Sequence, residues 1–325
     1  MKQWKTVFIL IFLMMFLSCS KQKSENILRL SHGLDVTHPV HKAMVYMDER
    51  LKEYSDGTLQ IQIYPGNQLG SERESLELLQ IGSLAMTKVS ANTLEGFVPE
   101  FRIFNLPYIF TGDEHRFRVL ESEMGKELLL KGIPNRFMGL CYYDAGSRSF
   151  YTKKTPVQEP DDLKGLKIRV MGSPTAIEMV NTMGGSATPI SWGELYTALQ
   201  QGIVDGAENN PPSFYTSRHY EVCKFYSLDE HTSVPDVLVM STAVWNGLSE
   251  EQKQWVRQAA DESAVYQKIL WQEATEEALR ELKANGVTIY HPDKSPFQRQ
   301  VAILYKKYEQ DPVLGEMIQQ IRAME

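Results

Sequence analysis

Two arginines stand where their side chains could bind an anion. Arg169 lies inside the largely apolar segment Leu166–Met171, which its pattern predicts as a strand, and Arg148 follows another apolar strand. A buried guanidinium is costly unless its charge is paired. Arg169 therefore faces either a protein carboxylate or a ligand carboxylate, which it could grip through two parallel hydrogen bonds. The local sequence leaves both alternatives open.

Three histidines, His32, His38 and His41, lie close together in the sequence. Imidazoles can bind a metal, but neither a cysteine nor a dense group of carboxylates accompanies these, so we expect no metal site. Pro39 predicts a helix start directly after His38. Because open α/β sheets bind ligands beyond the carboxyl ends of their strands, we expect His38 to make a polar contact with a ligand.

The linear motifs of catalysis and cofactor binding are absent. The sequence contains no G-x-x-x-x-G-K-[ST], no G-x-G-x-x-G after a predicted strand, no G-x-S-x-G, no H-E-x-x-H and no C-x-x-C. We therefore expect a protein that is not an enzyme and that needs no cofactor.

The N-terminal residues have the features of a secretory signal. Lys2 and Lys5 precede an apolar run over residues 7–17, and this run is shorter than the about 20 residues that span a bilayer. We expect residues 1–18 to be removed as a signal peptide.

The residues at the end of this run, 16–19, resemble the lipobox of bacterial lipoproteins, although Leu17 stands where a smaller residue is usual. A polar, charged tract follows. We expect Cys19 to be the site of lipid attachment and residues 19–26 to form a tether to the membrane, although removal of Cys19 with the signal is the alternative.

The chain is acidic, with a formal net charge of −7 that becomes more negative when a signal carrying two lysines is removed. This charge argues against nucleic acid as a partner, and it requires local cations to hold any anionic ligand. Of the cysteines beyond the signal, Cys141 lies in an apolar stretch and is expected to be buried. A disulfide between Cys141 and Cys223 is an alternative in an oxidising compartment.

Strand and helix patterns alternate along the chain, which indicates an α/β fold. Residues 27–31 and 59–64 have strand patterns, and residues 39–54 between them repeat apolar residues at helical spacing. Such a β-α-β unit implies two parallel strands. Residues 113–131 are expected to form one helix, and a second β-α-β set covers residues 166–190.

One predicted helix is unusually long. Ser249 and Gln252 form a capping box, and no proline or glycine follows until Gly286. This gives about 35 residues, or roughly 50 Å at 1.5 Å per residue. A helix of this length must cross more than one packed unit.

Several segments, in this order and spacing, resemble the solute-binding receptors of TRAP transporters, the tripartite ATP-independent importers of organic acids. The segments are Tyr64–Gly70, Asn105–Phe110, Asp162–Arg169, Ser191–Gly202 and Val204–Asn209. The resemblance implies an α/β, two-domain periplasmic-binding-protein-like (class II-like) fold with a long helix that spans both domains. A cleft between the domains would close on the ligand by a hinge motion.

The resemblance also implies a domain division and a location. The first domain would comprise residues 27–150 and about 240–325, with the spanning helix at 250–284, and the second would comprise residues 151–239. The protein would be periplasmic, anchored to the membrane as a lipoprotein, and would deliver its ligand to separate TRAP membrane subunits.

By family position, Arg169 resembles the residue that pairs with the substrate carboxylate, and Arg148 a second cation near it. Trp192 would be a packing face for the ligand, and Asn209 an amide that donates and accepts hydrogen bonds.

Three further residues, Glu72, Lys88 and Asn92, resemble the polar set of uronate-binding members. A carboxylate at Glu72 would repel a second ligand carboxylate and accept from sugar hydroxyls, although an acid at a helix start is also favoured by the helix dipole alone. The expected ligand is therefore a hexuronate, glucuronate or galacturonate, ahead of another sugar acid such as a ketogulonate and of a C4-dicarboxylate. A secreted uronate-acting hydrolase or lyase, and an interaction lipoprotein with an unoccupied cleft, are the alternatives of other classes.

Overall fold

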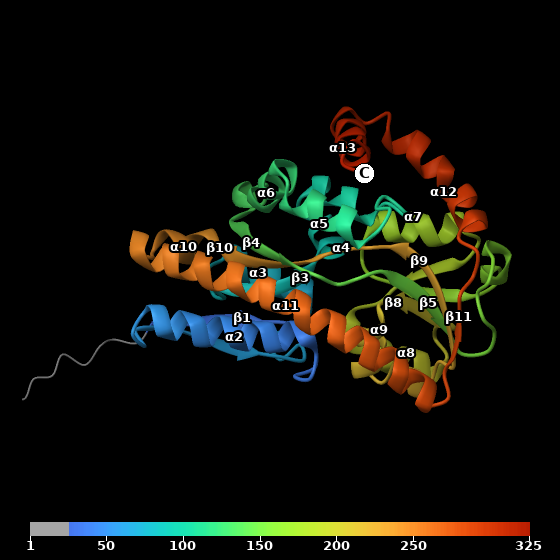
Figure 1. Ribbon diagram of the computed structural model, residues 1–325, viewed down its shortest axis with the longest axis horizontal. Coiled ribbons are helices and arrows are strands. Elements are labelled where there is room, and N and C mark those ends of the chain that lie inside the picture. The colour runs from blue at the N-terminus through green and yellow to red at the C-terminus, as the bar shows by residue number, and fades with distance from the viewer. Residues whose placement is uncertain (1–25) are drawn as a thin grey trace, which may run out of the picture.

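Two β-sheets lie side by side in the computed structural model, and helices flank each of them (Figure 1). The structure describes residues 26–325. The predicted signal peptide, Cys19 and all but the last residue of the predicted tether lie outside the described residues. Within residues 26–325, no helix combines the length and apolarity that crossing a membrane requires.

The first sheet has the strand order β2-β1-β3-β10-β4. Its strands are β1 (Asn26–Ser31), β2 (Leu59–Tyr64), β3 (Met86–Ser90), β4 (Phe137–Tyr143) and β10 (Asp236–Ser241). Strand β1 is parallel to β2 and β3, whereas β10 is antiparallel to β3 and β4. Helix α2 (Pro39–Tyr54) connects β1 to β2, so the predicted β-α-β unit is confirmed.

The second sheet has the strand order β11-β9-β5-β8-β6-β7. Its strands are β5 (Arg148–Thr152), β6 (Lys167–Val170), β7 (Ser186–Pro189), β8 (Gly206–Asn209), β9 (Phe225–Thr232) and β11 (Thr288–Tyr290). Strand β6 is parallel to β7 and β8, and α7 (Pro174–Thr182) connects β6 to β7. The second predicted β-α-β set therefore also forms.

We call the first sheet with its helices the first lobe, and the second sheet with its helices the second lobe. The chain crosses between the lobes from β4 to β5 and returns from β9 to β10. The predicted division put residues 148–150 and 288–290 in the first domain, but β5 and β11 belong to the second sheet. Both are short strands that pair with β9, and β5 also pairs with β8; these partners are distant in the sequence.

Helix α11 (Glu250–Ala284) is 35 residues long and begins at the predicted capping box of Ser249 and Gln252. It packs against α2 in the first lobe and against α9 (Pro211–Thr216) in the second. Figure 1 shows it running along both lobes. The predicted helix that spans two packed units is confirmed.

The segment 113–131 forms two helices rather than the one predicted. Ser122 takes an extended conformation with ψ 168°, and its side chain accepts a hydrogen bond from the Gly125 N–H. It therefore ends α5 (Asp113–Glu121) and caps α6 (Glu123–Leu130).

The remaining helices are shorter than α11, and those labelled η are 3-10 helices. They are α3 (Glu72–Gln80), α4 (Ala91–Leu94), η2 (Pro99–Asn105), η3 (Ile133–Asn135), η4 (Pro160–Leu163), α8 (Trp192–Gln201), η5 (His219–Glu221), α10 (Thr242–Asn246), α12 (Ser295–Tyr308) and α13 (Pro312–Arg322).

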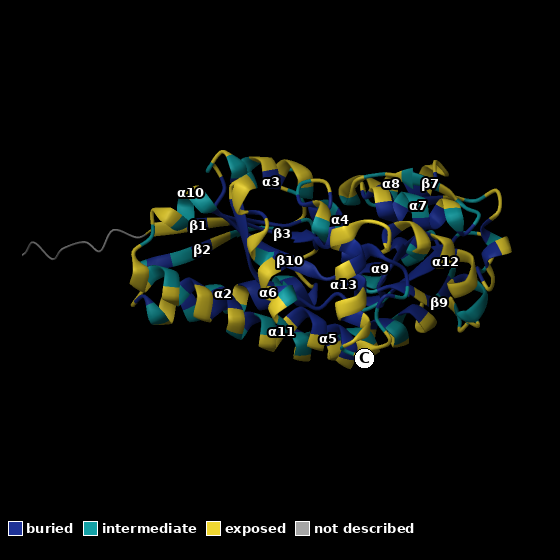
Figure 2. Ribbon diagram, turned by 90° about the horizontal axis from the view of Figure 1, so that it is seen from above, coloured by how far each residue is buried: buried dark blue, intermediate teal, exposed yellow. Residues whose placement is uncertain are grey.

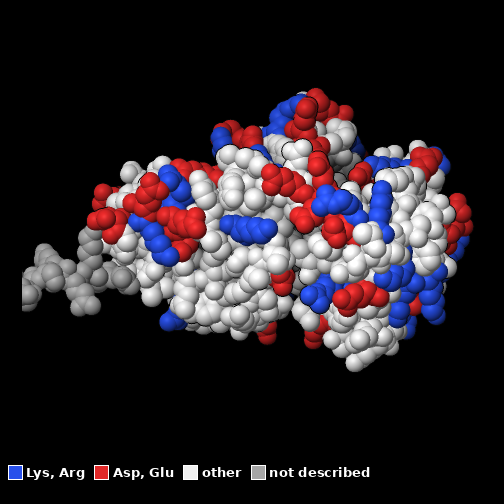
Figure 3. Space-filling view, turned by 60° about the horizontal axis from the view of Figure 1, so that its bottom comes forward, with Lys and Arg blue, Asp and Glu red and all other residues white. Residues whose placement is uncertain are grey.

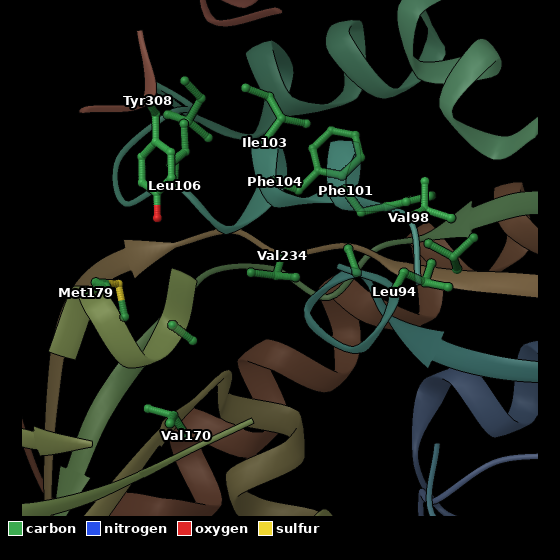
Figure 4. Packing of buried hydrophobic residues seen from close by; sticks show 14 of the residues in the cluster. Leu94, Val98, Phe101, Ile103, Phe104, Leu106, Val170, Met179, Val234 and Tyr308 are labelled. Atoms are coloured by element: carbon green, nitrogen blue, oxygen red, sulfur yellow. The ribbon is translucent and has the colours of Figure 1, made fainter. Parts of the chain in front are cut away.

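Most residues of the central strands and the inner faces of the helices are buried, whereas the outer faces of the helices are exposed (Figure 2). One apolar cluster joins the lobes beside the returning chain. Leu94 and Phe101 of the first lobe and Val170 and Met179 of the second belong to the same cluster as Val234, which lies between β9 and β10 (Figure 4). The apolar packing is therefore continuous across this crossing.

Both cysteines in the described part of the chain, Cys141 and Cys223, are buried and free. Burial was expected for Cys141, and no disulfide joins the pair. Burial also raises the pKa of the Cys223 thiol to about 12, which suppresses the reactive thiolate.

Candidate functional site

Two adjoining cavities lie between the lobes and share the side chains of Glu72, Met171 and Trp192. The larger has a volume of about 280 Å³ and contains Arg169. The smaller, of about 40 Å³, contains Arg148 and further polar residues from both lobes. We call the two together the interlobe cleft.

Six of the eight predicted ligand-binding residues line the interlobe cleft. They are Glu72, Lys88, Arg148, Arg169, Trp192 and Asn209. They come from α3, β3, β5, β6, α8 and β8 respectively, so the fold assembles the site from both lobes. The two others, Asn92 and His38, are not among the residues that line it.

Arg169 lies on β6 and is only 1% exposed. Its Nε donates to the carbonyl oxygen of Ile190 at 2.8 Å, and its guanidinium carbon lies 5.8 Å from the centroid of the Trp192 ring. Within the described chain, Nη1 has no hydrogen-bond partner and no carboxylate forms an ion pair with this arginine. Burial lowers the pKa of Arg169, although a guanidinium stays protonated at neutral pH.

Arg148 has the opposite environment, because its charge is paired within the protein. Its Nη2 donates to Glu208 Oε1 at 2.9 Å and to the Glu208 carbonyl oxygen at 2.8 Å, and Nη1 donates to Asn209 Oδ1 at 3.0 Å. Burial raises the pKa of Glu208, but Arg148 and His231 outweigh this effect and hold it at about 2. The second predicted cation is thus neutralised by an acid that the sequence did not single out.

Asn209 is oriented by the same network. Its Oδ1 accepts from Arg148 and also from the backbone N–H of Asn210 at 2.9 Å. Both bonds occupy the oxygen, so the Nδ2 group of the amide is the part left to donate to a ligand.

Lys88 lies between two carboxylates. Its Nζ donates to Glu72 Oε1 at 2.9 Å and to Asp236 Oδ1 at 3.2 Å. The other Glu72 oxygen accepts from Ser90 N at 3.2 Å and from Thr93 Oγ1 at 2.7 Å. Asp236 also lines the interlobe cleft. Sequence reasoning missed it, although an acid at the start of the apolar strand β10 was a visible signal.

The pKa values of Asp236 and Glu72 shift in opposite directions. Burial raises the pKa of Asp236. For Glu72 burial acts in the same direction, but Lys88 and the hydrogen bonds outweigh it and lower the pKa. Three charged groups therefore share one local network, with one more carboxylate than cation.

Asn92 is buried beside this network, at 3% exposure. Its Oδ1 has no hydrogen-bond partner within residues 26–325. Asn92 thus offers an unsatisfied acceptor near the cleft, and its contact with a ligand stays a prediction.

His38 caps the N-terminus of α2 instead of facing the cleft. Its Nδ1 accepts from the Val40 N–H at 3.2 Å, and its Nε2 lies 3.2 Å from Ser213 Oγ. Ser213 belongs to α9 of the second lobe and lines the cleft. His38 is therefore connected to the cleft indirectly, by its hydrogen bond with Ser213.

The other two histidines bond to each other, with 2.9 Å between His32 Nε2 and His41 Nδ1. Burial lowers the pKa of His32 to about 3. In the described part of the molecule, no group of three or more His, Cys, Asp or Glu side chains could hold a metal ion.

The cleft thus has one cation with unused binding capacity. Lys88 and Arg148 are paired with acids inside the protein, and Arg73 at the rim pairs with Glu77 at 3.2 Å. Arg169 is the one cleft-lining cation that forms no ion pair within residues 26–325. Acidic and basic side chains are intermixed on the face shown in Figure 3.

Two lobes joined by crossing strands, with an interlobe cleft that holds a guanidinium without an ion-pair partner in residues 26–325, define a solute-binding protein for a small anion. Residues 30–311 match the family of bacterial extracellular solute-binding proteins known as family 7, or DctP. The chain belongs to this family, and its class of function is transport: the capture of a solute outside the cytoplasm.

Solved structures of TRAP periplasmic solute-binding proteins share the whole fold. One from Bradyrhizobium, in complex with α/β-D-galacturonate, is 38% identical with a TM-score of 0.89 and covers 92% of this chain and 100% of its own. One from Anaerococcus prevotii, with bound α/β-D-glucuronate, is 37% identical with a TM-score of 0.90, covering 92% and 98%. The two-domain fold predicted from the sequence is confirmed.

A relative with a different ligand is also similar. The C4-dicarboxylate-binding periplasmic protein DctP of Rhodobacter capsulatus is 32% identical over 269 residues, covering 82% of this chain and 80% of the relative. Family membership alone therefore does not define which acid is bound.

Proposed function

We propose that this protein is the receptor of a TRAP transporter that captures a hexuronate, D-glucuronate or D-galacturonate, in the interlobe cleft. The ligand carboxylate pairs with Arg169, and the sugar ring lies against Trp192. The bound uronates of the Bradyrhizobium and Anaerococcus proteins support this proposal.

The observation that carries the proposal is the unpaired Arg169 guanidinium. A fully buried cation without an acid is unfavourable, and it becomes favourable when a carboxylate arrives and accepts two charge-assisted hydrogen bonds. One such cation suits a ligand with one carboxylate.

The rest of the cleft suits hydroxyl groups. Asn209 offers Nδ2 as a donor, and Glu72 and Asp236 offer carboxylate oxygens as acceptors. A pyranose ring carries hydroxyls that both donate and accept, and its apolar face packs on an aromatic ring.

A C4-dicarboxylate is the second candidate, because the Rhodobacter relative binds one. Its second carboxylate would need another free cation. Lys88 already lies between Glu72 and Asp236, and Arg148 is bonded to Glu208. A second carboxylate would meet more acid than base near Lys88, so the arrangement favours the uronate.

The test is a thermal-shift screen followed by calorimetric titration. A ligand at about a thousand times its Kd adds roughly 4 kcal/mol to stability and raises Tm by several degrees. D-glucuronate or D-galacturonate should do this, succinate much less, and D-galactose, which lacks the carboxylate, not at all. A succinate effect equal to or above that of both uronates would replace the proposed substrate with a dicarboxylate.

Binding without turnover is also part of the proposal. The acids of the cleft are engaged in the ion pairs described above, so none is free as the general acid or base that a hydrolase or lyase requires. Incubation of the protein with a uronate, followed by NMR of the sugar, should show unchanged ligand. Any product that scales with protein concentration would favour the enzyme alternative.

The proposed receptor acts in the periplasm, held to the membrane by a lipid on Cys19, and passes its ligand to separate TRAP membrane subunits. The support for the anchor is the lipobox-like sequence at residues 16–19 and the polar tract after it.

A further inference from the structure

Asn67 is held firmly on the first lobe, in the loop after β2. Its backbone has a left-handed conformation with φ 60°, which asparagine tolerates better than most residues. Its N–H donates to the His32 carbonyl oxygen at 3.1 Å, and its own carbonyl accepts from the Gly70 N–H at 3.0 Å. The backbone therefore fixes the position from which this side chain extends.

The Asn67 side chain lies between two glycines that belong to different lobes. A β-carbon placed on Gly33, two residues after the end of β1, would lie 2.6 Å from Asn67 Oδ1. A β-carbon placed on Gly193, in the first turn of α8, would lie 2.9 Å from Asn67 Nδ2. Both distances are below van der Waals contact, so a side chain on either glycine would force the Asn67 side chain to move, and at Gly193 it would do so across the boundary between the lobes.

Gly193 has no other reason to be a glycine. Its φ is not positive, unlike that of Gly202 at the end of the same helix, so alanine would suit its backbone and would favour the helix. What glycine supplies at this position is room for Asn67.

This contact is adjacent to the ligand-binding side chains. Gly193 follows Trp192, whose ring covers Arg169, and Asn67 lines the same cavity as Arg169. Motion of α8 toward or away from Asn67 therefore moves the aromatic face of the proposed site.

We infer that Asn67 and Gly193 form the closing contact of the cleft, at which the lobes seat against each other when the ligand is bound. Asn67 is a positioning residue: it sets how far α8 approaches the first lobe and thereby where Trp192 lies over Arg169. That a uronate drives this closure rests on the proposed function.

Replacement of Gly193 by alanine separates closure from folding. Gly193→Ala should raise the Tm of the unliganded protein slightly, because alanine favours a helix, and should weaken D-galacturonate or D-glucuronate at least tenfold by keeping the lobes apart. Gly112→Ala is the control, because Gly112 does not line the cleft, its φ of 167° is extended, and its added β-carbon would meet nothing within 4 Å. Wild-type affinity of Gly193→Ala would overturn the inference.

The loss should be reversed by removing the partner side chain. Asn67→Gly keeps a residue that accepts φ 60° and frees the space that the new methyl group needs. The double variant Asn67→Gly, Gly193→Ala should bind more tightly than Gly193→Ala alone, a non-additive result that residues in direct contact produce. Additive losses would contradict the contact.

A disulfide tests the contact without reliance on the ligand. The Asn67 Cβ lies 4.0 Å from the β-carbon position of Gly193, within the 3.5–4.5 Å range of disulfides. The variant Asn67→Cys, Gly193→Cys should therefore form an intramolecular bond under mild oxidation, and each single-cysteine variant should not. Failure to form it, with and without ligand, would overturn the closing contact.

The variant Asn67→Cys, Gly193→Cys also tests the closing contact and the proposed substrate separately. If the contact and the proposed function both hold, D-galacturonate or D-glucuronate accelerates the bond. A bond that forms at the same rate with and without uronate, in a protein that no uronate stabilises, would leave the contact intact and refute the proposed substrate.

Discussion

The Arg169 guanidinium carbon lies 5.8 Å from the centroid of the Trp192 ring, while its Nε donates to the Ile190 carbonyl oxygen. Two neighbours thus orient the guanidinium, and Nη1 is left without a partner in the described chain. Because the fork is already fixed, less side-chain entropy is lost when a carboxylate binds. This preorganisation makes Arg169 the first residue to test.

Arg169→Lys should weaken the best uronate by about 2–4 kcal/mol, a factor of roughly thirty to a thousand. Lysine keeps the charge but replaces the planar fork by a point donor, so one hydrogen bond is lost and the other is displaced. Isothermal titration calorimetry on the two proteins measures the difference.

The unliganded Arg169→Lys variant should keep a Tm close to that of the wild type, because no carboxylate in the described part of the chain loses its partner. A buried ion pair broken by mutation would instead cost roughly 3–5 kcal/mol without any ligand. Strong destabilisation combined with unchanged affinity would make Arg169 a structural residue.

Glu72→Gln should shift selectivity from uronates toward succinate. The change removes one of the two carboxylates that neutralise Lys88, so the cleft would repel a second ligand carboxylate less. We expect the ratio of the succinate Kd to the uronate Kd to fall about tenfold, or about 1.4 kcal/mol.

Ser71→Ala is the control for this change. It removes the side chain that caps the start of α3 together with Glu74, but it removes no charge from the cleft. If both variants keep the wild-type ratio of dissociation constants, Glu72 does not select against dicarboxylates.

The free energy of unfolding should decrease at alkaline pH because His231 loses its charge there. Burial disfavours its charged form, but Asp229, at 2.8 Å from Nδ1, and Glu208 outweigh this effect and raise its pKa to about 9. A raised pKa means that the stabilisation is complete below the unfolded value near 6.5 and is lost as the pH rises through about 9. The loss should be on the order of 3 kcal/mol, at 1.36 kcal/mol per unit.

Urea unfolding at several values between pH 6 and pH 10 measures this loss. His231→Gln should be less stable at pH 6 and should show a shallower decline toward pH 10. Parallel declines in the two proteins would mean that other groups cause the alkaline loss.

Cys19 should carry lipid when the full chain is expressed in a bacterial host. Intact mass should show a lipid increment on a mature N-terminal Cys19, and the protein should partition into detergent, since each buried CH₂ contributes roughly 0.8 kcal/mol. Cys19→Ala should remain in the aqueous phase. A mature wild-type protein that begins downstream of Cys19 would show that the residue is only part of the removed signal.

The amino-acid sequence by itself determined the fold class. Alternating patterns such as those of β1, α2 and β2 are local, because strand and helix periodicities arise from neighbours a few residues apart. The long helix α11 was equally visible, since its capping box at Ser249 and the absence of proline and glycine are local features. The split at Ser122 was missed because a serine that caps one helix differs little in sequence from a serine inside it.

The sequence placed Arg148 and Arg169 on strands, but it could not say which of them has a free charge. The tertiary structure decided this through strand pairing: β5 lies antiparallel to β8, which brings Glu208 to Arg148 across 60 residues. Arg169, on the other side of β8, forms no ion pair with an acid of residues 26–325. Ion-pair partners are set by sheet neighbours distant in the chain, and only the folded arrangement shows which cation is left for a ligand.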